Sequence, residues 1–158
     1  MSQRGVTLVE LLIVVAIVGL MAGISFPAIS SGIDSLRLAS ASDALVSFLN
    51  GALNRAERRQ EVVEIAISTK DNAAYMTSIE PGFSRKLEMP SGVTIQGVLP
   101  KLPDEIEGPR RFLLLPGSTV PRIGIELQNR RGMRRIVRVN PMTGVPEIER
   151  LGPKEAAE

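Results

Sequence analysis

The chain has 158 residues, with 19 Lys and Arg against 17 Asp and Glu, a net charge of +2, and neither cysteine nor histidine. These absences exclude disulfides, a thiolate nucleophile, an imidazole base and a zinc site built from His or Cys. The sequence also lacks a Walker A loop, a dinucleotide-binding glycine motif, a Gly-x-Ser-x-Gly elbow and an EF-hand loop. We therefore expect no enzyme: no catalytic residue, no cofactor, no metal site and no small-molecule substrate.

The first predicted element is a long apolar helix near the N-terminus. From Val6 to Ile29 only Thr7, Glu10 and Ser25 are clearly polar, and a helix of this length spans about 36 Å, enough for a bilayer core. Basic charge precedes this run and an acidic residue is the first charge after it, so the N-terminus is expected in the cytoplasm. The pattern predicts one membrane-spanning helix over residues 6–30.

Glu10 lies inside this run, where a charged side chain costs roughly 2.5–3.5 kcal/mol. We therefore expect a cationic partner for it. A cleaved secretory signal ending at Ala39-Ser40-Ala41 fits poorly, because an acid interrupts the apolar region and the small residues lie too far beyond it. A plain signal anchor, with Glu10 close to the headgroups, stays open.

A specific motif surrounds Glu10: the leader Met1-Ser2-Gln3-Arg4, then Gly5, then Val6-Thr7-Leu8-Val9-Glu10-Leu11. It resembles the class III signal of type IV pilins and type II secretion pseudopilins, with Val6 where that family usually has Phe. The resemblance implies that a prepilin peptidase removes the leader, residues 1–5, by cutting between Gly5 and Val6, and then N-methylates Val6. It also implies a single-pass inner-membrane protein with a periplasmic head that later joins other pilins or pseudopilins in a filament.

The same resemblance supplies the partner of Glu10. Cleavage would create an ammonium at Val6, and in a packed array the Val6 ammonium of one subunit can neutralise the Glu10 carboxylate of its neighbour. Such a pair fixes register more than it adds stability. Gly19 and Pro27 match the family positions between which the helix can lose helicity in filaments, so we expect them to serve assembly. A bent membrane helix with small packing residues is the alternative.

An amphipathic continuation of this helix is predicted over residues 31–60. Its apolar residues recur every three or four positions: Leu38, Ala41, Leu45, Phe48, Ala52 and Ala56. Asn50-Gly51 is the weak point, because this pair could form a turn instead. We expect the stripe to pack on the rest of the chain and the helix to end near Arg59.

From residue 61 the apolar period becomes two, which predicts antiparallel strands separated by Gly and Pro turns. The strands contain Val63-Ile65-Ile67, Tyr75-Thr77-Ile79, Val93-Ile95, Ile123-Ile125-Leu127 and Val137-Val139. Residues 100–109 read as an exposed loop, and residues 151–158 as a flexible tail. The expected fold is α+β and pilin-like: a long N-terminal helix packed on an antiparallel β-sheet head over residues 61–150.

The last third of the chain resembles the GspH/FimT family of minor pseudopilins and minor pilins. The resemblance is carried by Phe112-Leu113-Leu114-Leu115-Pro116-Gly117-Ser118, Ile123-Gly124-Ile125-Glu126-Leu127, Arg135-Ile136-Val137 with Val139, and Thr143-Gly144. It implies a structural subunit of one of these two filament types. It does not separate them.

Residues 110–138 hold eight arginines and one acid, so their local balance is +7 (eight minus one). Asn129 to Met133 reads as the tip of a hairpin, which would display Arg130, Arg131 and Arg134 on one projection, with Arg135 and Arg138 following. Such a surface can bind the DNA backbone through counterion release. It can equally meet acidic patches of a neighbouring subunit, and Glu147 and Glu149 replace the basic motif that DNA-binding members of the family carry near the C-terminus.

The sequence therefore favours a GspH-like minor pseudopilin, processed by prepilin peptidase and assembled into the periplasmic pseudopilus of a type II secretion system. The alternative is a FimT/FimU-like minor type IV pilin, acting in pilus initiation or DNA uptake through the arginine-rich hairpin. A nucleic-acid-binding module on a membrane anchor is a third hypothesis.

Overall fold

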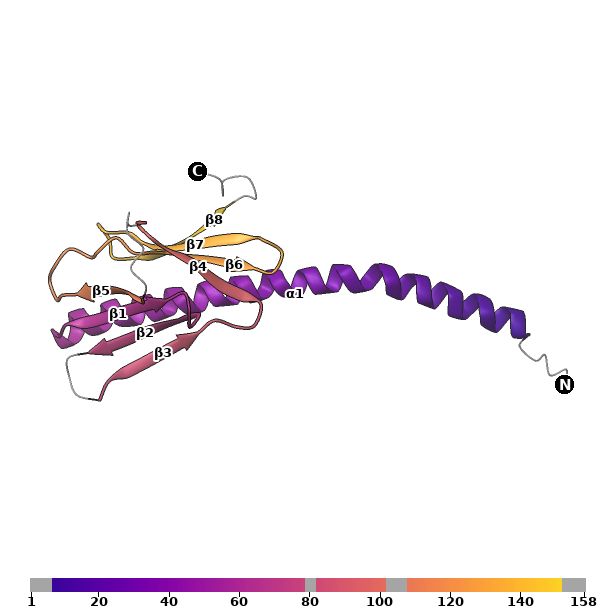
Figure 1. Cartoon of the computed structure of the whole chain (residues 1–158), viewed down its shortest axis with the longest axis horizontal. Coiled ribbons are helices and arrows are strands. Elements are labelled where there is room, and N and C mark those ends of the chain that lie inside the picture. Colours follow the sequence, from indigo (N-terminus) through magenta and orange to yellow (C-terminus); the bar gives the residue numbers. More distant parts are fainter. Residues whose placement is uncertain (1–6, 79–81, 102–107, 152–158) are drawn as a thin grey trace. The chain divides into compact units, whose positions relative to one another are not determined.

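The computed structural model describes residues 7–78, 82–101 and 108–151, without the side chains of residues 24–31. It contains one helix, α1 (Leu8–Arg59), and the strands β1 (Val63–Ser68), β2 (Ala73–Ser78), β3 (Ser84–Glu88), β4 (Val93–Leu99), β5 (Arg110–Leu114), β6 (Gly124–Asn129), β7 (Arg134–Val139) and β8 (Pro146–Leu151) (Figure 1). The chain divides into two compact units, one up to Ile33 and one from Asp34 onward. The predicted class, a helix packed on antiparallel strands, is confirmed.

The first unit contains the beginning of α1. Among the residues whose side chains are described, no helix is both long enough and apolar enough to cross a membrane. The membrane-spanning helix expected over residues 6–30 stays a prediction. Residue 6 and the side chains of residues 24–30, which belong to that range, lie outside the described residues.

In the second unit, α1 buries the predicted apolar stripe. Leu38, Ala41, Leu45, Phe48, Ala52 and Ala56 are all buried, and Leu49 joins them. The helix continues through Asn50-Gly51, so no turn forms there. It ends at Arg59, followed by Gln60 with a left-handed φ of 52°.

The strands form two four-stranded antiparallel sheets, where the sequence predicted one. The first sheet has the order β3-β2-β1-β5, and the second has the order β4-β6-β7-β8. Strands β3, β5 and β8 were not among the predicted alternating strands. The first and last lie at sheet edges, where charged side chains discourage the unpaired backbone from pairing with another strand. Leu151 ends β8, so the predicted tail begins one residue too early.

One hydrophobic core joins the helix stripe to both sheets. It combines Leu45 and Leu49 of α1 with Ile65 and Met76 of the first sheet and Leu127 of the second, each no more than 1% exposed. The helix is thus the packing partner of both sheets, so the protein forms one core with few aromatic residues. Of the remaining predicted segments, Ile79, Pro81 and residues 102–107 lie outside the described residues.

Asn72, in the turn between β1 and β2, joins the two sheets. Its side-chain Nδ2 donates to the carbonyl of Val93, and its Oδ1 accepts from the amide of Ile95, both at 2.8 Å. Asn72 also has a φ of 50°, which few residues other than Gly and Asn adopt readily.

Replacing Asn72 by alanine is expected to lower the free energy of unfolding by about 2 kcal/mol, because two partly buried backbone groups lose their partner. Urea denaturation of the full chain in detergent, followed by circular dichroism, measures this loss. Asn54→Ala, on the exposed side of α1, is the control and should change stability by less than about 0.5 kcal/mol. Equal effects of the two substitutions would contradict the assigned role.

Candidate assembly segment and arginine hairpin

The apolar beginning of α1 is exposed in the part of the chain that the structure describes. Its large side chains are each at least 53% exposed, and they point to every side of the helix: Leu8, Val9, Leu11, Leu12, Ile13, Val14, Val15, Ile17, Val18, Leu20 and Met21. A helix that is apolar all round is normally buried in a membrane or within an assembly. We call residues 8–23 the assembly segment.

Glu10 lies in the first turn of α1 and is exposed. Its backbone amide donates to the Thr7 hydroxyl at 3.3 Å, and the amide of Leu11 donates to the Thr7 carbonyl at 3.2 Å. Thr7 therefore caps the helix, and the carboxylate of Glu10 lies near the positive end of the helix dipole. Sequence reasoning did not identify this cap, although the Thr-x-x-Glu spacing is its usual signature.

The other predicted assembly residues differ in what the structure records. Gly19 is helical, and a Cβ added there would meet no atom within 4 Å, so packing within this chain does not require glycine. Pro27 lies within α1, but its side chain is outside the described residues. Gly5 and Val6, the predicted cleavage and methylation residues, are outside them too.

The predicted arginine hairpin is present. Strand β6 ends at Asn129 and β7 begins at Arg134. The Oδ1 atom of Asn129 accepts from the amides of Arg131 and Met133, each at 3.0 Å, and Gly132 has a φ of 79° that suits glycine. The turn is thus built by one buried amide side chain and one glycine.

Three of the five predicted arginines lie close to acids, and the display of Arg130, Arg131 and Arg134 on one projection stays a prediction. Arg131 lies 3.7 Å from an Asp34 oxygen, Arg134 lies 3.0 Å from a Glu126 oxygen, and Arg138 lies 3.5 Å from a Glu149 oxygen. Pairing of neighbouring strands brings Glu126 and Glu149 to Arg134 and Arg138, whereas Asp34 reaches Arg131 from a distant part of the sequence.

Arg130 and Arg135 differ from the other three. The Nε atom of Arg130 lies so close to Gly92 that a Cβ on this glycine would approach it to 3.1 Å. Arg135 follows Arg134 in β7, so it points to the opposite face of the sheet, in register with Leu127 and Arg150. DNA binding by these five residues remains a prediction.

The described residues contain no group of three His, Cys, Asp or Glu that could hold a metal ion. Among the groups that the structure describes, two have clearly shifted pKa values, and both face solvent on β3. A hydrogen bond between them raises the pKa of Lys86 and lowers the pKa of Glu88. Both groups therefore stay charged near neutral pH, and neither gains the properties of a general acid or base.

Residues 1–26 match the family described as the prokaryotic N-terminal methylation motif. The chain is also 30% identical over 88 residues to the Pilin-like protein PilA1 of Thermus thermophilus. Both findings support the type IV pilin and pseudopilin class. The stretch shared with PilA1 covers 56% of this pilin-like chain and 55% of PilA1, so the chain spans about half the length of this curated relative. No solved structure matches it.

For a pilin-like chain, the placement of the predicted residues is informative. The methylation motif covers Gly5, Val6, Glu10 and Gly19, which surround or lie within the uncovered assembly segment. The arginines lie in the other unit, in contact with its own acids. The resemblance of the last third of the chain to GspH and FimT proteins remains a prediction.

Proposed function

We propose that this chain is a structural filament subunit, held in the inner membrane by its N-terminal segment until prepilin peptidase cuts after Gly5. The observation that carries the proposal is the assembly segment, an apolar helix surface without protein cover that holds one carboxylate, Glu10. Lipid covers this surface before processing, and the helices of neighbouring subunits cover it in the filament.

Glu10 has a defined task in this proposal. Cleavage between Gly5 and Val6 forms an ammonium, which N-methylation leaves positively charged. The Val6 ammonium of one subunit meets the Glu10 carboxylate of the next where water is scarce. Removing two ions from water offsets most of their attraction, so the pair chiefly selects the correct stagger of neighbouring helices.

Within the class we propose a GspH-like minor pseudopilin, which enters the periplasmic pseudopilus of a type II secretion system. Its partners are then prepilin peptidase, other pseudopilins and inner-membrane lipid. The name of the Thermus relative, a pilin-like protein, supports a second candidate, a minor type IV pilin of the FimT type. Deleting the gene distinguishes the two, since one role predicts lost protein secretion and the other predicts lost surface pili.

Mass spectrometry of the mature protein tests the shared part of the proposal. We expect a chain that starts at Val6 and is heavier by one methyl group. A Gly5→Leu variant is the control and should keep the leader, because the residue before the cut is altered. A mature protein that still starts at Met1 would contradict the proposal.

A further inference from the structure

The tip of the β6–β7 hairpin contacts α1 at the first residues of the second unit. Figure 1 shows this turn beside the helix. The Nδ2 atom of Asn129 donates to the carbonyl of Asp34 at 3.4 Å, and Arg131 lies 3.7 Å from the Asp34 carboxylate. Next to them, the hydroxyl of Ser35 lies 4.0 Å from the sulfur of Met133. Three contacts therefore link this turn to the part of α1 with which the second unit begins.

Asn129 performs two tasks with one amide group. Its Oδ1 builds the turn by accepting from the amides of Arg131 and Met133, and its Nδ2 holds the helix. The side chain is only 5% exposed, so each of these bonds satisfies a group that water cannot easily reach. The side chain of Asn129 therefore both holds the β6–β7 turn and contacts α1 at Asp34.

We propose that this tip is a clamp, formed by Asn129, Arg131 and Met133, that fixes where along α1 the second unit begins to hold the helix. The first buried side chain of the helix in this unit is Leu38, one turn beyond Asp34. Without the clamp, the helical turn that starts at Asp34 would lose these contacts with the hairpin, and the nearest buried side chain would be Leu38. In this assignment Arg131 makes a contact within its own chain, because its guanidinium lies beside the Asp34 carboxylate.

The clamp predicts that Asn129→Asp frees the first helical turns of the second unit. The substituted side chain keeps an oxygen for the turn but loses the donor to Asp34. Amides of residues 35–41 should then exchange with solvent about fivefold to tenfold faster, since a partly buried hydrogen bond is lost. Hydrogen-exchange mass spectrometry of the full chain in detergent measures this, with amides of β6 and β7 as the internal reference.

Two further variants keep the test decisive if Asn129→Asp unfolds the protein. Arg131→Gln removes one of two cations near Asp34, since Arg37 stays 3.9 Å from the other carboxylate oxygen, and should raise exchange of the same amides about twofold. Asn140→Asp is the matched control. The Oδ1 atom of Asn140 accepts from the amide of Met142 in the turn that follows β7, as the Oδ1 atom of Asn129 accepts from amides in the turn before β7. This control should leave residues 35–41 unchanged.

Unchanged exchange at residues 35–41 in both clamp variants would overturn the proposal. The proposal also fails if Asn129→Asp accelerates exchange uniformly over the second unit while Arg131→Gln has no effect, because Asn129 would then only build its turn. This experiment does not depend on filament formation, so it stands or fails separately from the proposed function.

Discussion

Glu10→Leu should be processed normally but enter filaments at least a hundredfold less well than the wild-type chain. The leucine extends the apolar surface of the assembly segment, so membrane insertion is not impaired. In the packed array, however, the Val6 ammonium of a neighbour would be buried without its carboxylate. Removing one partner of a buried ion pair costs about 3–5 kcal/mol, which corresponds to this loss.

Filament incorporation can be measured by shearing or cross-linking the assembled subunits and probing for the chain with an epitope tag. Glu10→Asp keeps the charge and should restore part of the signal. Glu147→Leu removes an exposed carboxylate from β8 and should have no effect. Undiminished incorporation of Glu10→Leu would refute the role of this residue in assembly.

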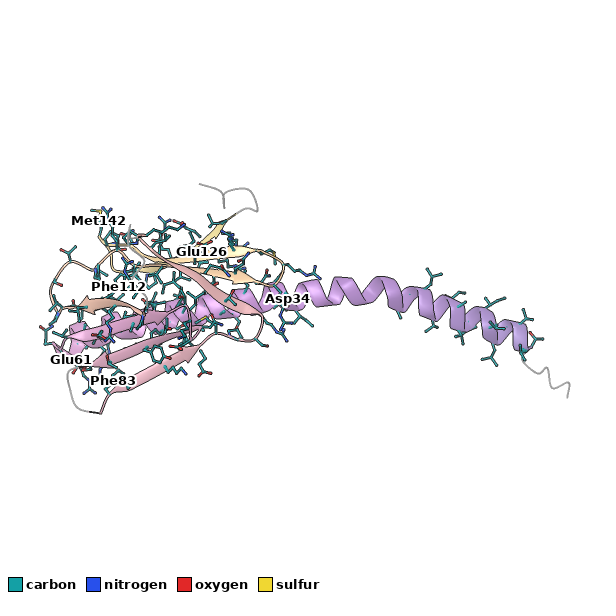
Figure 2. The ribbon with its side chains drawn as sticks, viewed as in Figure 1. Asp34, Glu61, Phe83, Phe112, Glu126 and Met142 are labelled. Atoms are coloured by element: carbon teal, nitrogen blue, oxygen red, sulfur yellow. The ribbon has the colours of Figure 1, made fainter. Side chains whose placement is uncertain are left out.

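Glu61→Leu should lower the free energy of unfolding by about 2–3 kcal/mol. Glu61 follows α1, and its Oε1 lies 2.5 Å from the Nε of Arg55, with both side chains no more than 15% exposed. The guanidinium carbon also lies 3.5 Å from the centroid of the Phe83 ring. Figure 2 labels Glu61 and Phe83. Without its carboxylate, this nearly buried cation would keep its desolvation cost and lose its strongest attraction.

Urea denaturation of the full chain in detergent gives this difference. Glu64→Leu is the matched control, because it breaks a pair with Arg111 whose side chain is 63% exposed, and such pairs contribute less than about 1 kcal/mol. The double variant Arg55→Met, Glu61→Leu should recover part of the lost stability, since apolar residues often replace a buried pair at little cost. Equal losses for Glu61→Leu and Glu64→Leu would show that burial does not strengthen the pair.

The helix and its buried stripe were predictable because the information is local. Residues three or four positions apart share a helix face, and the stripe from Leu38 to Ala56 follows this spacing. Even the doubtful Asn50-Gly51 is helical, since Leu49 and Ala52 on either side are fully buried and hold the backbone there. Burial of the stripe outweighs the weak helix propensity of this pair.

The division into two sheets and the pairing of the arginines were not predictable from local patterns. Strand β1 pairs with β5, and β4 pairs with β6, across long intervals of sequence. Arg131 and Asp34 are almost a hundred positions apart, and Arg111 and Glu64 nearly fifty. A count of charges in one stretch therefore overstates the charge that this stretch presents to a partner.

The position of Asn72 has a consequence for how the protein associates. Strand β4 is an edge strand of seven residues without a charged side chain, a kind of edge to which strands of other molecules readily add. The amide of Asn72 already occupies the outward-facing carbonyl of Val93 and amide of Ile95, and an irregularity between Ile95 and Gly97 breaks the ladder beyond them. In the proposed filament, where subunits would gather at high local concentration, this edge of β4 would therefore not pair with a neighbouring strand, and association through helices would be favoured.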